Sequence, residues 1–112
     1  MTVSLNGYTA GYATLEAAEG LEPGVVAMSG DHQVDAPAAG AAFAGVALSV
    51  RDGLALVQLS GICRLPYTGT APTVGYCKLA ADGTGGIKVA ETGRELLVTA
   101  VDSTGKTAEV LL

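Results

Sequence analysis

Apolar and polar residues alternate along much of the chain, in short runs that end at turn-forming residues. In the run from Leu54 to Leu65, one face of an extended chain carries Val57, Leu59, Gly61, Cys63 and Leu65. A period of two residues is typical of a β-strand with one buried side. Gly, Asp, Asn, Ser and Pro interrupt the sequence at spacings too short for helices of ordinary length. The pattern predicts an all-β fold.

Two β-hairpins are predicted by alternating runs on either side of a turn. Arg51-Asp52-Gly53 separates the run 44–50 from the strand that begins at Leu54. Asp-Gly favours a tight hairpin turn because Gly adopts a positive φ at little cost. Near the C-terminus, Asp102-Ser103-Thr104-Gly105 separates the runs 96–100 and 108–112 in the same way.

The two hairpins belong to a longer pattern that repeats after about 50 residues, a period at which internal duplication is expected. Before each hairpin the matching segments are Gly24–Met28 and Gly75–Leu79, Gln33–Val34 and Ile87–Val89, and the loops 37–40 and 91–94. We therefore expect two similar half-units, 12–61 and 62–112, which share one core as a small barrel or sandwich.

Helix is expected to be scarce. Thr14–Gly20 could form a short helical turn that ends at Gly20. Pro37–Ala42 is rich in Ala but interrupted by Gly, which favours a loop.

The N-terminal residues 1–11 form an arm without a charged side chain, and Tyr8 in the arm and Tyr12 just after it fall on one face if the chain is extended. Edge strands normally carry charges that block unwanted pairing. An uncharged arm could therefore add as a strand to a neighbouring subunit or partner. The alternative is a first strand that pairs within its own domain.

Length and composition narrow the class of protein. A chain of 112 residues forms a single domain (1–112) by the usual length prior. Hydrophobic residues make up 49% and charged residues 15%, which argues against a disordered chain. The net charge of −5 excludes a basic nucleic-acid-binding surface as a bulk property. We expect neither a signal peptide nor a membrane-spanning segment, because no apolar stretch approaches about 20 residues.

The negative charge is concentrated in one half of the sequence. Residues 12–61 contain six acids and one base, whereas residues 62–112 contain five of each sign. An uneven field of this kind steers docking with partners.

The side chains needed for catalysis or metal binding are scarce. One His and two Cys argue against a zinc site, and no cofactor is expected. His32 follows Ser29 and Asp31, but a catalytic triad requires geometry rather than sequence adjacency, so we expect an exposed turn. Gly83–Lys88 lacks the spacing of a phosphate-binding loop. The chain is not expected to be an enzyme, and we expect Cys63 and Cys77 to be reduced and buried rather than bridged.

Four segments stand out together: Phe43–Ala47, Val57 through Gly61 to Leu65-Pro66, Val74-Gly75-Tyr76, and Gly93 before the alternating C-terminus. With these segments the chain resembles the small capsid decoration proteins of tailed bacteriophages, also called head cement or capsid stabilising proteins. The resemblance begins at about Leu21 and covers most of the chain, although Leu97-Val98-Thr99 departs from the Gly-Val of the first half. It implies a β-rich protein that binds the outside of an assembled capsid, often as a trimer, without catalytic residues.

The expected function is that of a structural virion protein, which binds the outer surface of a phage capsid and bridges capsid subunits. Its expected partners are the major capsid protein and copies of itself, with a homotrimer favoured and neither nucleic acid nor membrane involved. Synthesis in the bacterial cytoplasm would precede its assembly on the capsid exterior. Tyrosine is favoured at interfaces, and the candidate contact residues are Tyr8, Tyr12, Tyr67 and Tyr76. The alternative is a soluble β-barrel binding or adaptor module for a small ligand or peptide.

Overall fold

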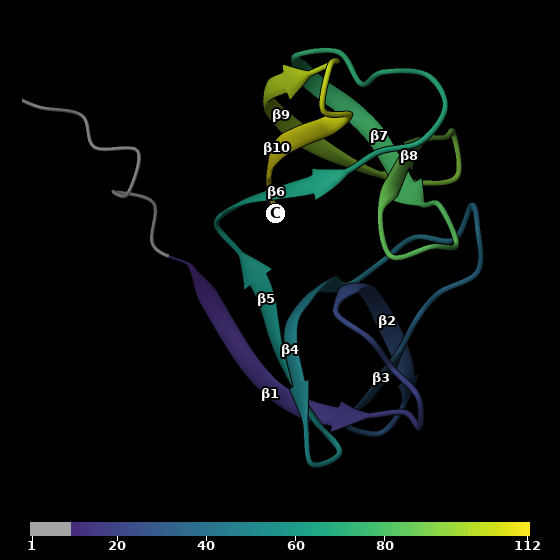
Figure 1. Ribbon diagram of the computed structural model, residues 1–112, viewed down its shortest axis with the longest axis vertical. Coiled ribbons are helices and arrows are strands. Elements are labelled where there is room, and N and C mark those ends of the chain that lie inside the picture. Colours follow the sequence, from purple (N-terminus) through teal and green to yellow (C-terminus); the bar gives the residue numbers. More distant parts are fainter. Residues whose placement is uncertain (1–9) are drawn as a thin grey trace, which may run out of the picture.

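Two five-stranded sheets make up the part of the chain that the computed structural model describes, residues 10–112 (Figure 1). The first sheet contains β1 (Gly11–Ala17), β2 (Gly24–Gly30), β3 (Gln33–Asp35), β4 (Gly45–Arg51) and β5 (Leu54–Ser60). The second contains β6 (Ile62–Pro66), β7 (Gly75–Ala81), β8 (Ile87–Val89), β9 (Arg94–Asp102) and β10 (Thr107–Leu111). The predicted all-β fold is confirmed.

The first sheet closes into a barrel with the strand order β1-β3-β2-β4-β5. Closure comes from β1, which pairs antiparallel with β5 and parallel with β3. Alternate residues of the strands point inward, as the period of two requires. The interior contains Leu21, Val26, Val34, Ala47, Ala55 and Val57.

The second sheet has the order β6-β10-β9-β7-β8. Its inward face carries Leu65, Leu79, Ile87, Leu96, Val98, Ala108 and Val110. An isolated parallel bridge joins Tyr67, just after β6, to Ile87 in β8. This bridge brings the two outer strands of the sheet together at one end.

The strand order is the same in the two sheets when strands are counted from the start of each. If the five strands of each sheet are numbered 1 to 5 along the chain, both sheets have the spatial order 3-2-4-5-1. This order is read from β3 in the barrel and from β8 in the second sheet. In both, a parallel contact joins the first and third positions. The similarity of the half-units 12–61 and 62–112 stays a prediction, and the shared order is the observation that supports it.

Both predicted hairpins are present. In the turn between β4 and β5, Asp52 and Gly53 have φ of 54° and 75°. Two successive positive φ angles are typical of the tight turn whose twist matches that of the flanking strands. The second hairpin joins β9 to β10, where the Asp102 carboxylate accepts hydrogen bonds from the amides of Thr104 and Gly105.

Two expectations about local structure were wrong. The run 54–65 is not one strand, because the backbone turns at Gly61, with a φ of 95°, and leaves the first sheet for the second. The segment 14–20 is not helical, because residues up to Ala17 belong to β1 and are held between β5 and β3. Pairing on both sides outweighs the weak local preference for helix in this segment.

The two sheets share part of their core. Val25, Phe43 and Val46 come from the first half of the chain but belong to the cluster inside the second sheet. Arg94 Nη1 donates a hydrogen bond to the Phe43 carbonyl (3.1 Å), and its guanidinium lies 5.8 Å from the centroid of the Phe43 ring. The Val25 amide donates to the carbonyl of Gly85 (3.0 Å). The fold therefore depends on contacts between the halves as well as within them.

Candidate interaction surface

The four candidate contact tyrosines lie in different environments. Tyr8 lies outside the described residues. Tyr12 on β1 is 53% exposed and Tyr76 on β7 is 72% exposed, whereas Tyr67 is 5% exposed. Tyr12 and Tyr76 are thus the accessible members of the set within residues 10–112.

Tyr67 lies in the core rather than on the surface. It continues the inward face of β6, two residues after the buried Leu65, and packs in the cluster inside the second sheet. Its amide donates to the carbonyl of Lys106 (3.0 Å). The alternation that starts at Cys63 could have predicted this burial, because Cys63, Leu65 and Tyr67 share one face.

Tyr12 belongs to a strand that pairs within the chain. The residue opposite Tyr12 is Gln58 on β5, and the Gly11 amide donates to Ser60 Oγ (2.9 Å). Gly11 and Tyr12 thus belong to a first strand that pairs within its own domain, which is the second of the two predicted arrangements. The rest of the arm, residues 1–9, lies outside the described part of the chain.

The outer face of the first sheet carries exposed leucines near Tyr12. Leu54 and Leu56 point outward from β5, where they alternate with the buried Ala55 and Val57. Leu48 is also exposed, at a point where the register between β4 and β5 shifts. Exposed apolar residues grouped on one face are typical of interaction sites.

The outer face of the second sheet carries an apolar row that crosses four strands. Tyr76 pairs with Leu97, Leu97 with Leu111, and Leu111 with Ile62. Partners in antiparallel strands point to the same face, with Cβ atoms about 5 Å apart. Their strand neighbours Leu96, Val98 and Val110 are buried, so the row faces outward. The residue type of Tyr76 makes it a candidate from the sequence alone, whereas the three aliphatic members become its neighbours only through strand pairing.

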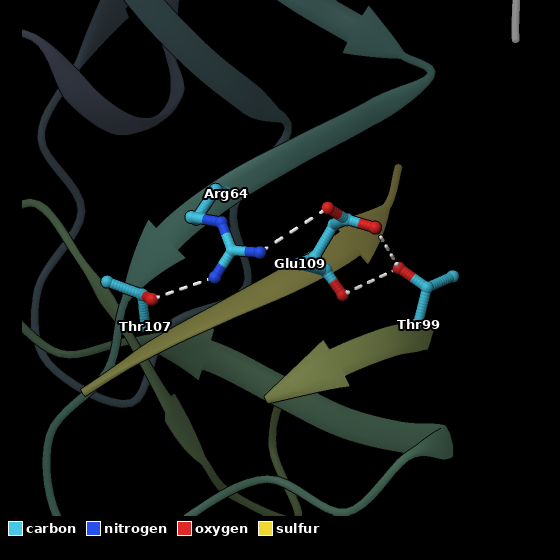
Figure 2. A network of polar contacts seen from close by, with 4 residues as sticks. All are labelled: Arg64, Thr99, Thr107 and Glu109. Carbon is cyan, nitrogen blue, oxygen red and sulfur yellow. Dashed lines mark hydrogen bonds and ion pairs between the residues drawn. The ribbon is translucent and has the colours of Figure 1, made fainter. Parts of the chain in front are cut away.

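A polar network lies on the same face, where Arg64 and Glu109 form the next outward-facing pair after Ile62 and Leu111. Figure 2 shows its four side chains. Arg64 on β6 forms an ion pair with Glu109 on β10 (3.5 Å) and donates to Thr107 Oγ1 (3.0 Å). Thr99 on β9 donates to Glu109 Oε1 (2.9 Å). Exposed ion pairs add little stability, but this network fixes side chains of both signs beside the apolar row.

The two cysteines are free and half-buried, and both pack against the core of the second sheet. Desolvation by burial raises the pKa of the Cys63 thiol to about 11. A thiol in such surroundings is a poor nucleophile at neutral pH, because the thiolate is the reactive form. At neutral pH the Cys63 side chain therefore packs against the core as a protonated thiol.

The segments with superficial catalytic patterns are turns. His32 is exposed with a φ of 59°, and Ser29 Oγ donates to Gln33 Oε1 (3.2 Å) rather than to a histidine. In the Gly-rich loop, Asp82 accepts hydrogen bonds from Thr84 and Gly86. Partial burial raises the pKa of Asp82, but these hydrogen bonds outweigh that effect and hold it below its ordinary value. The loop carboxylate thus stabilises the turn.

A cleft of about 280 Å³ lies where loops of the two halves meet. Its lining includes Glu19, Glu22, Asp35 and Thr84. Small-molecule sites usually have volumes of about 300–1,000 Å³, so this cleft is at the lower end. Its acidic lining would favour a cationic group.

Within residues 10–112, no group of three or more His, Cys, Asp or Glu side chains is arranged to hold a metal ion. The same residues contain no helix that is long and apolar enough to cross a membrane.

No protein-family model matches the sequence, and comparison with curated proteins gives no significant match.

Proposed function

We propose that this chain is a structural virion protein that binds the outer surface of a tailed-phage capsid and stabilises it by bridging capsid subunits. The observation that carries the proposal is the placement of Tyr12 and Tyr76, one exposed tyrosine on each sheet. Two separate contact points let one copy touch two capsid subunits at once. The sequence resemblance to capsid decoration proteins supports the same role.

The expected partners are the major capsid protein and further copies of this chain, with a trimer favoured, on the capsid exterior. Tyr8, Tyr12 and Tyr76 are the proposed contact residues, and we leave out Tyr67 because it is buried. Tyrosine supplies a large apolar area together with a hydroxyl group, and it is enriched among residues that dominate binding energy.

The experiment is a sedimentation assay with empty capsids assembled from a tailed-phage major capsid protein. We expect saturable co-sedimentation and a higher temperature of capsid dissociation.

Replacing a residue that dominates binding costs at least about 2 kcal/mol, or roughly 30-fold in affinity. Tyr12→Ala and Tyr76→Ala should therefore each weaken capsid binding by that factor. Ser103→Ala, in the exposed turn between β9 and β10, is the matched control. Absence of co-sedimentation at saturating protein would refute the proposal.

A second candidate is a soluble β-barrel module that binds a small ligand or peptide. The cleft of about 280 Å³ favours it, and the carboxylates of Glu19, Glu22 and Asp35 point to a cationic ligand. It ranks second because the cleft is small for such a site.

A further inference from the structure

We propose that the outer face of the second sheet is an interface between copies of this chain, in which the second sheet of one copy packs against the second sheet of another. The contact is centred on the row Tyr76, Leu97, Leu111 and Ile62. This inference rests on the self-association named in the proposed function and assigns the surface that carries it, and it does not depend on capsid binding.

The row is apolar across its whole width. Tyr76 is 72% exposed, and Val74, two residues before it, is 69% exposed. Leu97, Leu111 and Ile62 are half-buried. The pairing register holds all four side chains on one face. A contiguous apolar surface of this kind marks an interaction site more strongly than scattered apolar residues do.

The first sheet has a row at the same strand positions, and this row is partly covered within the chain. There, Val25 pairs with Val46, Val46 with Gln58, and Gln58 with Tyr12. Val25 and Val46 are 2% and 5% exposed because they pack into the core cluster of the second sheet. Val25, which stands in the first sheet where Tyr76 stands in the second, is therefore covered by a contact between the two sheets, whereas Tyr76 is open to solvent.

The charge distribution favours a second copy as the occupant. Residues 12–61 carry a net charge of −5, so two first halves repel each other, whereas residues 62–112 are balanced. Beside the row, Arg64 is paired with Glu109, and Lys78 lies opposite Glu95. A face with both signs in balance meets its own copy without net repulsion. Packing through the second sheets also holds the acidic first sheets apart.

The size of the face predicts weak association. Four strands about 4.8 Å apart and five residues of about 3.3 Å each give a face of roughly 19 by 17 Å. That is about 320 Å² in plan, well below the roughly 800 Å² per partner of a standard stable interface. We therefore expect assembly to depend strongly on protein concentration.

The test is sedimentation of the full chain from about 10 μM to about 1 mM, the range that covers weak dissociation constants. We expect the mean mass to rise with concentration. Tyr76→Arg should raise the dissociation constant at least about tenfold, since it places like charges in the interface. Met28→Arg is the matched control, because Met28 is 53% exposed on β2 of the first sheet and lies outside the proposed contacts, and it should change the constant less than about twofold. Raising the salt concentration from about 0.02 to about 0.15 M should strengthen assembly, because it screens the acidic halves.

Two results would overturn the inference: a wild-type chain that stays monomeric across this range, or an assembly that Met28→Arg weakens and Tyr76→Arg does not. Unchanged thermal unfolding of both variants establishes that the fold is intact. A monomeric chain that still binds capsids through Tyr76 would overturn the self-contact and leave the proposed capsid binding standing.

Discussion

At the scale of single residues, burial controls the chemistry of Cys63. Its side chain packs against the core of the second sheet, and desolvation raises its pKa from 9.0 to about 11. A thiol reacts through its thiolate. At pH 8, the native side chain therefore has about a hundredfold smaller thiolate fraction than the ordinary value gives.

We predict that native Cys63, isolated in a Cys77→Ser variant, reacts with a thiol reagent at pH 8 at least about a hundredfold more slowly than the denatured chain. Because the folded pKa lies above the unfolded value, the protonated thiol contributes stability that is fully present below about pH 9 and lost as the pH rises toward about 11. Denaturant midpoints should fall over this interval and fall less in Cys63→Ser. Native and denatured rates that agree would contradict the prediction.

The tyrosines show what a sequence pattern specifies at the residue scale. Tyr67 was predicted to contact a partner because of its residue type, yet alternation with Leu65 places it in the core. Tyr76 points outward because its neighbour Cys77 packs inward. Position within the alternation, rather than residue type, decides which tyrosine is available.

At the scale of strands, the sequence predicted elements with local signals and missed those set by distant contacts. The β4–β5 hairpin follows from Asp52-Gly53, which needs no information beyond its neighbours. The break at Gly61 was missed because the alternation continues through it. The apolar row of the second sheet was missed for a related reason, since Ile62 and Leu97 become neighbours through β10.

The break between β5 and β6 depends on Gln58, which is 4% exposed. Its side-chain amide donates to the carbonyls of Ser60 (3.0 Å) and Ile62 (3.1 Å), on either side of Gly61. We predict that Gln58→Met lowers the free energy of unfolding by about 1–3 kcal/mol, because two partly buried hydrogen bonds beside Gly61 are lost.

The control for this variant is Gln33→Met, where the amide oxygen accepts one exposed hydrogen bond from Ser29. Surface changes of this type usually alter stability by less than about 0.5 kcal/mol. Urea denaturation measures both variants. Equal effects at Gln58 and Gln33 would show that the carbonyls beside Gly61 do not depend on the side chain.

At the scale of the whole molecule, the halves differ in charge while sharing a strand order. The acidic excess lies in residues 12–61, and the balanced residues 62–112 carry the open apolar row. The first halves of two copies therefore repel each other, while the second halves carry the face proposed for contact between copies. This division is the property from which both the self-contact and its salt dependence follow.

The shared core predicts that the two sheets unfold together. Phe43 is 2% exposed and lies in the cluster of the second sheet, although it belongs to the first half of the chain. Phe43→Ala should lower the free energy of unfolding by about 3–5 kcal/mol, since it removes a large buried side chain. In a cooperative unit, the most protected amides of all strands exchange through the same global opening. Hydrogen exchange should therefore show equal losses of protection in β5 of the first sheet and β9 of the second. A loss confined to β9 would mean that the first barrel remains folded on its own.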